Sequence, residues 1–266
     1  MMTENRLHTF VICAYKESPY LEECILSLKA QTLQTGIIMV TSTPNAHISA
    51  LSEKYGIPLS VNKGEGGIVQ DWNFGYAMCR TKYITIAHQD DIYLPEYAER
   101  AVAMLEASKK PLIFFTDYAE LRDGIRVDNN QLLKVKRLLL SPLKVRAFRG
   151  NKWIRRRSLS LGCGICCPSV TFAVRNLPDQ VFTVQYRSCE DWQAWERISR
   201  IKGEFLYCPK ILMAHRIHEE SATTNILQDN GRTQEDYEMF CKFWPKWIAK
   251  LLVRFYSKSE ESNQMG

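Results

Sequence analysis

The sequence lacks any long hydrophobic run. No stretch of its 266 residues reaches the ~18 uninterrupted apolar residues typical of a membrane-spanning helix. Residues 1–8 are polar and have neither the basic flank nor the apolar core of a secretory signal. We therefore expect a cytoplasmic protein, and the basic tail described below adds the expectation of peripheral contact with the inner face of the cell membrane.

An even, regularly spaced set of cysteines is also missing. The chain has nine cysteines, scattered through segments that resemble strands and helices, which does not suggest a disulfide framework. Cys163, Cys166 and Cys167 lie close together, but no second pair of zinc ligands follows at a matching spacing. We expect buried thiols here rather than a zinc site.

Acidic residues are absent from two stretches of the chain. Residues 129–178 contain eleven Lys and Arg and no acid, and residues 239–259 contain five and no acid. Removing these sixteen positive charges from the net charge of +6 leaves −10 for the rest of the chain. The positive charge is thus local, which indicates anionic partners at these two places.

Strand-like and helix-like segments alternate through the first half of the chain. β-Branched and apolar runs predict strands, and apolar residues at helical spacing predict helices between them. This alternation favours an α/β fold with a mostly parallel sheet flanked by helices, in which ligands bind beyond the carboxyl ends of the strands. We predict one Rossmann-like domain over residues 1–225 and a basic amphipathic helical tail over 226–266. The predicted strands are 7–14, 37–41, 58–61, 83–87 and 111–116, with helices beginning at Pro19 and covering 48–55, Trp72 to Tyr76 and 95–108.

Two adjacent carboxylates, Asp90 and Asp91, directly follow the apolar strand 83–87. Two such groups repel each other unless a positive charge lies near them, and a Mg²⁺ or Mn²⁺ ion carrying a diphosphate would supply it. The alternative is a solvated Asp-Asp turn before the next helix.

A second acidic pair, Glu190 and Asp191, precedes apolar residues at helical spacing. It is either a catalytic pair or a pair that stabilises a helix N-terminus, where carboxylates contribute about 0.3–1 kcal/mol. Further along, His218 offers a neutral nitrogen to a metal and Arg216 can pair with phosphate.

Five motifs occur in an order that resembles family 2 glycosyltransferases, over about residues 7–224. The resemblance implies a glycosyltransferase A fold and sugar transfer with inversion at the anomeric carbon. The motifs are Ala14-Tyr15-Lys16-Glu17, Trp72-Asn73-Phe74-Gly75, Gln89-Asp90-Asp91-Ile92-Tyr93-Leu94-Pro95, Glu190-Asp191 and Arg216-Ile217-His218-Glu219-Glu220-Ser221.

The resemblance also implies roles for individual residues. Asp91 and His218 would hold Mn²⁺ or Mg²⁺, Asp191 would be the general base, and Glu190 would contact sugar or acceptor. Asp71 or Asn73 would help to hold the nucleotide base. The residues implied around the nucleotide sugar are Tyr15, Glu17, Asp71, Asn73, Asp90, Arg216 and Ser221.

The sequence departs from the family pattern at two positions. The second strand ends in Thr41-Ser42-Thr43, where the family usually has an acidic residue that touches the nucleotide. Gln89 stands where the metal motif usually begins with an acid, so metal affinity depends mainly on Asp91. Both departures bear on the donor, which we expect to be a UDP-sugar.

The two basic stretches leave alternatives open. In the tail, Lys or Arg recurs every four residues from Lys242 to Lys258 among aromatic and leucine residues. Such a helix either lies on an anionic membrane surface or packs its apolar face on the domain. Residues 131–157 either meet a diphosphate-lipid or acidic glycan at the acceptor cleft or form a solvated loop. No recognised nucleic-acid-binding motif is present, so nucleic acid is not an expected partner.

Together these features predict a metal-dependent, inverting hexosyltransferase. It would move a sugar from a nucleotide-sugar donor to a hydroxyl of a glycan or lipid-linked acceptor. Surface polysaccharide synthesis at the cell envelope is the context that the resemblance implies. The alternatives are a non-catalytic carbohydrate- or membrane-binding protein on the same fold and a metal-dependent nucleotidyltransferase.

Overall fold

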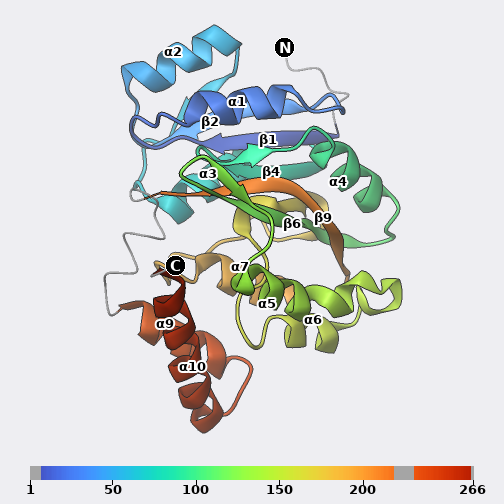
Figure 1. Ribbon diagram of the computed structural model, residues 1–266. Helices are drawn as coiled ribbons and strands as arrows, with labels where there is room; N and C mark the ends of the chain where they lie inside the picture. The colour runs from blue at the N-terminus through green and yellow to red at the C-terminus, as the bar shows by residue number, and fades with distance from the viewer. Residues whose placement is uncertain (1–6, 219–230, 265–266) are drawn as a thin grey trace.

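A mixed nine-stranded sheet forms the centre of the computed structural model, which describes residues 7–218 and 231–264 (Figure 1). The strand order is β3-β2-β1-β4-β8-β6-β9-β5, and β7 pairs with β6 outside this path. Strands β3, β2, β1 and β4 are parallel, as the alternating pattern predicts. These four strands are β1 (His8–Cys13), β2 (Gly36–Thr41), β3 (Leu59–Val61) and β4 (Tyr83–His88).

The helices of the first half lie close to their predicted positions. Asn45 caps α2 because its side chain accepts a hydrogen bond from the backbone N–H of Ile48, and Gly56 ends the helix in the left-handed region with φ of 62°. Gly75 lets α3 approach the sheet closely, since a Cβ atom there would lie 2.5 Å from Val11 Cγ1. The helices are α1 (Leu21–Lys29), α2 (Ala46–Tyr55), α3 (Ile68–Met78) and α4 (Tyr97–Glu106).

The second half of the sheet is only partly parallel. Strand β8 runs antiparallel to both of its neighbours, β4 and β6, whereas β6 and β9 are parallel to each other. Strand β5 pairs antiparallel with β9, with Ile92 opposite Ala214, and this pairing brings the residues before β5 beside the end of β9. The strands are β5 (Ile92–Tyr93), β6 (Pro111–Arg122), β7 (Ile125–Val127), β8 (Val170–Ala173) and β9 (Glu204–Ile217).

Successive residues of β1 supply two different cores because side chains alternate across a strand. Phe10 and Ile12 pack with α1, α2 and α4 on one face, and Val11 packs with α3 and α7 (Glu190–Ser199) on the other. All three side chains are fully buried. The parallel half of the sheet is therefore covered on both faces, as expected for an α/β fold.

Residues 131–157 fold into α5 (Gln131–Leu140), 3₁₀ turns and α6 (Lys152–Ser158), so the solvated loop, one of the two alternatives for this stretch, is wrong. Arg155 is fully buried and donates to the carbonyl oxygens of Ile201 and Gly203, which ties α6 to the start of β9. Arg156 pairs with the buried Glu196 of α7. Several positive charges of this stretch thus hold the framework together.

Two helices follow near the end of the chain, α9 (Gly231–Cys241) and α10 (Lys246–Gln264). Met239, Phe240, Ala249 and Val253 from these helices belong to the same core cluster as α3 and α7. Of the two alternatives for the tail, the structure thus shows packing of one helix face on the domain. Within the described ranges, no helix has the length and apolar character needed to cross a bilayer.

Candidate active site

The predicted site residues at the ends of β1 and β4 lie in neighbouring loops. Gln89 links the two loops, because its Oε1 accepts from the Tyr15 backbone N–H at 2.9 Å and its Nε2 donates to the Tyr15 carbonyl at 3.0 Å. Lys16 adopts a left-handed conformation (φ 53°), and its backbone N–H donates to Thr43 Oγ1 at the end of β2. The Tyr15 ring and Glu17 are exposed beside this junction.

Asp91 is fully buried, and its two carboxylate oxygens have different surroundings. Oδ1 accepts hydrogen bonds of 2.9 Å from His215 Nδ1 and from the backbone N–H of Arg216. Oδ2 has no hydrogen-bond partner and lies 3.9 Å from His88 Nδ1. One oxygen is therefore held by β9, while the other remains available for a ligand.

Asp90 lies beside His218, which was predicted to hold the metal together with Asp91. Oδ2 of Asp90 is 3.0 Å from Nε2 of His218 at the end of β9. Burial alone would raise the pKa of Asp90, but the charges of His88 and His215 and the hydrogen bond to His218 outweigh it and lower that pKa. His218 thus contacts Asp90, and its ring lies 5.0 Å from the Tyr20 ring.

Arg216, predicted to support the diphosphate, has contacts with α1 and with the Asp90–Asp91 turn. Its guanidinium group lies over the Tyr20 ring, pairs with Glu23 of α1 and donates to the Asp90 carbonyl oxygen, and the residue is buried. These contacts connect Arg216 to the Asp90–Asp91 turn and to α1. Ser221, the other residue predicted to support the diphosphate, lies outside the described residues.

The ligand atoms of His88, Asp90 and Asp91 lie within 4.8 Å of one another. Carboxylate oxygens and an imidazole nitrogen suit Mn²⁺ or Mg²⁺, and the unpartnered Oδ2 of Asp91 lacks a positive group that an ion would supply. The residues therefore fit a divalent metal. His88 also stacks on Trp72 (5.2 Å between ring centroids), and burial lowers the pKa of His88, which favours the neutral form that binds metals.

Asp71 lies beside the end of β2, where the family usually has an acidic residue and this chain has hydroxyl side chains. The carboxylate of Asp71 accepts hydrogen bonds from Ser42 Oγ (2.6 Å) and Asn62 Nδ2 (2.8 Å), so α3 brings an acidic side chain to the hydroxyl-rich end of β2. Asn73 instead uses both atoms of its amide group to bond the backbone of Phe182. Asp71 thus places a carboxylate at the end of β2, whereas the amide group of Asn73 is bonded to the backbone of Phe182.

The second acidic pair opens α7, as its sequence predicts. Asp191 Oδ1 accepts from the Trp192 backbone N–H (2.6 Å), and Oδ2 is 3.7 Å from Cys163 Sγ. Burial raises the pKa of Asp191, and burial together with the charge of Asp191 raises the pKa of Glu190 to about 7. Carboxyl groups with raised pKa values suit proton transfer near neutral pH.

Three residues of the site escaped the prediction from sequence. His88 and His215 surround Asp91, and Lys136 of α5 donates to Tyr118 Oη at 2.8 Å, with its charge acting on both Asp191 and His215. Burial opposes a charged His215, but the charge of Asp91 and its hydrogen bond outweigh burial and raise the pKa of His215. Two of the three had a signal in the sequence, since His88 directly precedes the acidic motif and His215 directly precedes Arg216 in the motif that contains His218.

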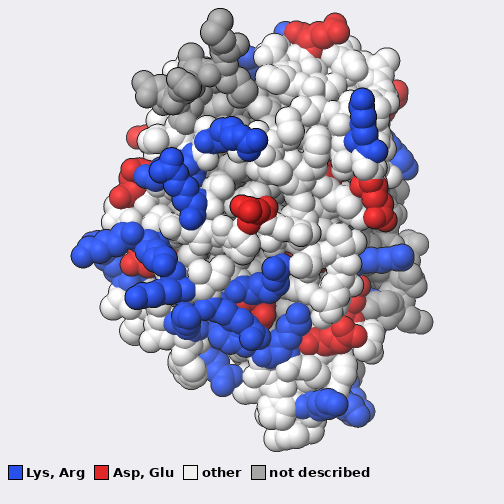
Figure 2. Space-filling view, turned by 180° about the vertical axis from the view of Figure 1, so that it is seen from behind, with Lys and Arg blue, Asp and Glu red and all other residues white. Residues whose placement is uncertain are grey.

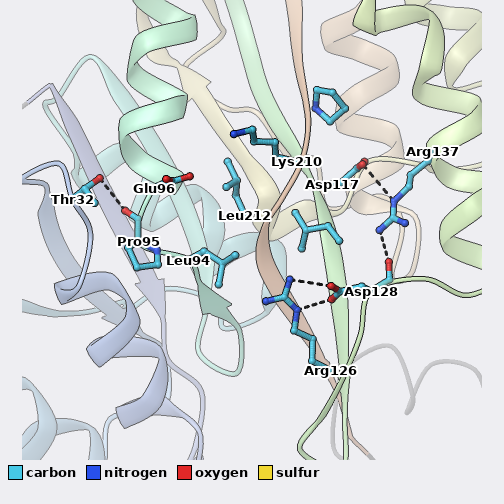
Figure 3. A pocket seen from close by; sticks show the side chains of 12 residues that line it. Thr32, Leu94, Pro95, Glu96, Asp117, Arg126, Asp128, Arg137, Lys210 and Leu212 are labelled. Carbon is cyan, nitrogen blue, oxygen red and sulfur yellow. Dashed lines mark hydrogen bonds and ion pairs between the residues drawn. The ribbon is translucent and has the colours of Figure 1, made fainter.

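An open pocket of about 920 Å³ lies apart from these residues, between α4, β6, β9 and α5 (Figure 3). None of its lining residues is among the predicted site residues. Its arginines are paired, Arg126 with Asp128 and Arg137 with Asp117. We therefore assign no ligand to this pocket.

Comparison with known proteins agrees with this geometry. Residues 9–162, more than half of the chain, match the family model described as glycosyl transferase family 2. The chain belongs to this family. The matched region contains both acidic residues after β4 and ends before the Glu190–Asp191 pair.

The similar proteins include several that are described as uncharacterised glycosyltransferases. One from Rickettsia bellii is 25% identical over 98% of this chain and 37% of its own length, and one from Haemophilus influenzae is 29% identical over 85% of this chain and 70% of its own. The chain thus spans little more than a third of the Rickettsia bellii protein.

Solved structures confirm the glycosyltransferase A fold. Staphylococcus aureus TarS residues 1–349 in complex with UDP-GlcNAc has a TM-score of 0.63 at 14% identity, covering 92% of this chain and 70% of that chain. The mannosyltransferase PcManGT from Pyrobaculum calidifontis, in complex with GDP-Man and Mn²⁺, has a TM-score of 0.61 at 13% identity, covering 94% and 70%. At these identities the similarity concerns the fold.

Proposed function

We propose that the chain is an inverting glycosyltransferase that moves a hexose from a nucleotide sugar to a hydroxyl of a glycan or lipid-linked acceptor. The observation that carries this proposal is the contrast between two acidic pairs in a family 2 chain. Asp90 and Asp91 lie among histidines and backbone N–H groups, whereas Glu190 and Asp191 open α7 beside Cys163 and have raised pKa values. Such a division separates ligand binding from proton transfer.

On this proposal Asp91, through Oδ2, holds a divalent metal together with Asp90 and His88 or His218. The bound ion supplies neutralisation of the charge that develops on the leaving nucleoside diphosphate. The protein fixes Asp91 through His215 and the Arg216 backbone, so the carboxylate is oriented before the donor arrives.

Asp191 is the proposed general base. It takes the proton of the acceptor hydroxyl while the hydroxyl oxygen forms a bond to the anomeric carbon and the bond from that carbon to the diphosphate oxygen breaks. A single displacement from the opposite face inverts the configuration and needs no covalent intermediate. Glu190, one residue away, is proposed to contact the sugar or the acceptor.

The nucleotide is proposed to lie over the ends of β1 and β2. Tyr15 and Glu17 are exposed at one side, and Asp71, held by Ser42 and Asn62, offers a carboxylate to a base or ribose donor. We propose a UDP-sugar because TarS, which shares the fold, has been solved with UDP and UDP-GlcNAc. Arg216 is proposed to position the Asp90–Asp91 turn, and Ser221 keeps its predicted place beside the diphosphate.

The cellular setting is a proposal that follows from the acceptor. A lipid-linked acceptor in surface polysaccharide synthesis would place a cytoplasmic enzyme at the inner face of the membrane, with residues 240–258 as the contact. We also propose that residues 1–225 form the catalytic region and that residues 226–266 form a helical extension.

Calorimetry of UDP, GDP and CDP, each with and without Mn²⁺, tests the donor site. We expect metal-dependent binding of UDP to the wild type, loss of that binding in Asp91→Ala, and no change in Asp179→Ala, a matched change of an exposed aspartate. Binding of none of the three nucleotides would overturn the proposal and leave a non-catalytic protein on the same fold. Release of pyrophosphate from a nucleoside triphosphate would instead identify a nucleotidyltransferase.

A further inference from the structure

The two acid-free stretches, 129–178 and 239–259, meet in the folded protein. Arg156 donates to the Lys242 carbonyl at 2.9 Å, and Trp244 Nε1 donates to the Ser160 carbonyl at 2.7 Å. The Arg157 guanidinium lies over the rings of both Trp153 and Trp244. Helix α6 is therefore attached to the connection between α9 and α10, and Figure 1 shows α5, α6, α9 and α10 together at one end, below the sheet.

Helix α10 exposes an apolar stripe at this end. Trp247, Leu251 and Phe255 recur every fourth residue, so they share one face, and their exposed fractions are 72%, 48% and 66%. A basic row, Lys246, Lys250 and Arg254, runs beside the stripe and is also exposed. Ala249 and Val253 bury the opposite face against the domain. The stripe thus remains outside the core that the helix helps to build.

The region from α5 to α6 has the same mixture of side chains. Val145, Phe148 and Trp153 are large apolar residues that the fold leaves exposed, with Trp153 exposed by 65%. Lys144, Arg146, Lys152 and Arg157 are exposed among them. Seen from behind, Lys and Arg side chains gather over the lower part of the molecule (Figure 2).

Exposed apolar residues are concentrated in the two stretches. Of the seventeen large hydrophobic residues exposed in the described parts of the chain, nine lie in residues 129–178 and 239–259. An apolar surface with basic residues and no acid suits an interface that offers hydrocarbon and negative charge together. An acidic protein or a nucleic acid would pair with the basic residues but would bury less of the apolar side chains than the hydrocarbon of a bilayer would.

We propose that α6, the turn before it and the exposed face of α10 form one docking surface for an anionic lipid bilayer. The surface consists of Val145, Phe148, Trp153, Trp247, Leu251 and Phe255 with the neighbouring Lys and Arg. The apolar side chains enter the boundary between headgroups and acyl chains, and the basic side chains bind anionic headgroups. This inference extends the membrane contact in the proposed function from the tail to a second segment, and its test needs no sugar transfer.

Tryptophan fluorescence can test the two segments separately. Trp153 and Trp247 are exposed, whereas Trp72, Trp192 and Trp195 are buried and Trp244 is partly buried. Vesicles of phosphatidylglycerol and brominated phosphatidylcholine should quench Trp153 and Trp247, and Trp153→Phe and Trp247→Phe should each remove part of the quenching. Vesicles of phosphatidylcholine alone should bind weakly, and added salt should weaken binding to the anionic vesicles.

Co-sedimentation with the same vesicles measures the contribution of each segment. Replacing Trp247, Leu251 and Phe255 together by Ser should weaken binding about tenfold or more, and replacing Phe148 and Trp153 by Ser should weaken it about three- to tenfold. Ile125→Ser and Lys109→Glu, matched changes at exposed positions outside the surface, should have no effect. Mn²⁺-dependent UDP binding, measured on every variant, reports the fold and the proposed donor site independently.

Three results would overturn the inference. If Trp153 is not quenched, and if the variant with Phe148 and Trp153 replaced by Ser binds the vesicles as the wild type does, α10 docks alone. Equal binding to neutral vesicles would exclude recognition of anionic lipid. Salt-sensitive binding to DNA that matches vesicle binding and tolerates loss of the apolar residues would identify a general polyanion surface.

Discussion

The two acidic pairs of this protein, Asp90–Asp91 and Glu190–Asp191, have the same chemistry and opposite surroundings. Asp91 receives two hydrogen bonds through Oδ1, and His88, His215 and His218 lie around the first pair. The second pair lies at the start of α7 beside Cys163, and burial raises the pKa of Asp191 more than the charges of Lys136 and Arg232 lower it. The pKa of Asp90 is lowered, and the pKa values of Glu190 and Asp191 are raised.

The comparison shows that the surroundings, more than the residue type, decide what a carboxylate can do. A carboxylate that stays ionised can ligate a cation, and one whose pKa is raised towards neutrality can accept a proton from an alcohol. Adjacent acids in the sequence look alike in both cases. Changing one member of each pair should therefore have separable effects, and the following predictions test that separation.

The largest effect is expected for Asp191→Asn. Removing the proposed base should lower turnover about a thousandfold, while metal-dependent nucleotide binding stays within about twofold of the wild type. The measurement is release of UDP from a UDP-sugar, with calorimetry on the same preparation. Loss of nucleotide binding with turnover preserved at saturating donor would contradict the division between the two pairs.

Asp91→Asn should show the reverse pattern. Its loss should weaken Mn²⁺-dependent nucleotide binding by about a hundredfold or more, because the amide oxygen that replaces the carboxylate is a weaker ligand for a hard cation. Titration of nucleotide at several Mn²⁺ concentrations measures the effect. A variant that binds nucleotide and metal as the wild type does would show that Asp91 is structural.

His215→Ala should weaken metal binding about 10- to 100-fold, because it removes a hydrogen bond that orients Asp91. Turnover at saturating metal should recover, since His215 is proposed to act through Asp91. His215→Asn, which keeps a side-chain donor, should restore part of the affinity. Equal losses in both variants that persist at saturating metal would argue for a direct role in the reaction.

Glu190→Gln should change stability in a pH-dependent way. Burial raises the pKa of Glu190 from 4.5 to about 7, so the folded wild type binds more protons than the unfolded chain between these values and loses stability as pH rises through them. Glutamine does not titrate. The variant should gain roughly 3 kcal/mol over the wild type at pH 8 relative to the difference at pH 4, measured by urea unfolding at both values. A difference that does not vary with pH would contradict the raised pKa.

The pH profile of the wild type provides the mildest test. Because burial raises the pKa of Asp191, kcat/KM should fall on acidification at a higher pH than an exposed aspartate would give. The profile of UDP-sugar hydrolysis, recorded at saturating Mn²⁺, locates this acidic limb. A limb at the position of an ordinary aspartate would mean that burial does not raise the pKa of Asp191 in the free enzyme.

The first half of the fold was predictable because its patterns are local. Apolar runs defined the parallel strands β1 to β4, and acidic residues directly after a strand indicated a site at the carboxyl edge. The second half depends on pairing between distant segments. Nothing near Asp91 in the sequence indicates that β5 would pair with β9 and bring His215 to it, 124 residues away.

Residue type was a weaker guide where the same side chain serves structure and function. Arg155 and Arg156 occur in a run that suggests an anion site, but they bind carbonyl oxygens and Glu196 inside the protein. Asp71 illustrates the opposite case, since a helix provides the carboxylate that β2 lacks. When one helix or strand provides a group that another lacks, only the three-dimensional contacts show it, because the sequence motif of neither element contains this information.

Gln89 has a consequence for how the site responds to its donor. By holding both backbone polar atoms of Tyr15, this side chain couples the loop after β1 to the loop after β4. Part of the ordering of these two loops is therefore completed during folding, so less conformational entropy remains to be lost when the donor binds. An acid at this position would add negative charge near the metal ligands but could not donate to the Tyr15 carbonyl. Compared with an acid, Gln89 thus attracts the metal ion less but holds the two loops more rigidly. Donor binding should therefore carry a smaller entropic penalty in the wild type than in a Gln89→Glu variant.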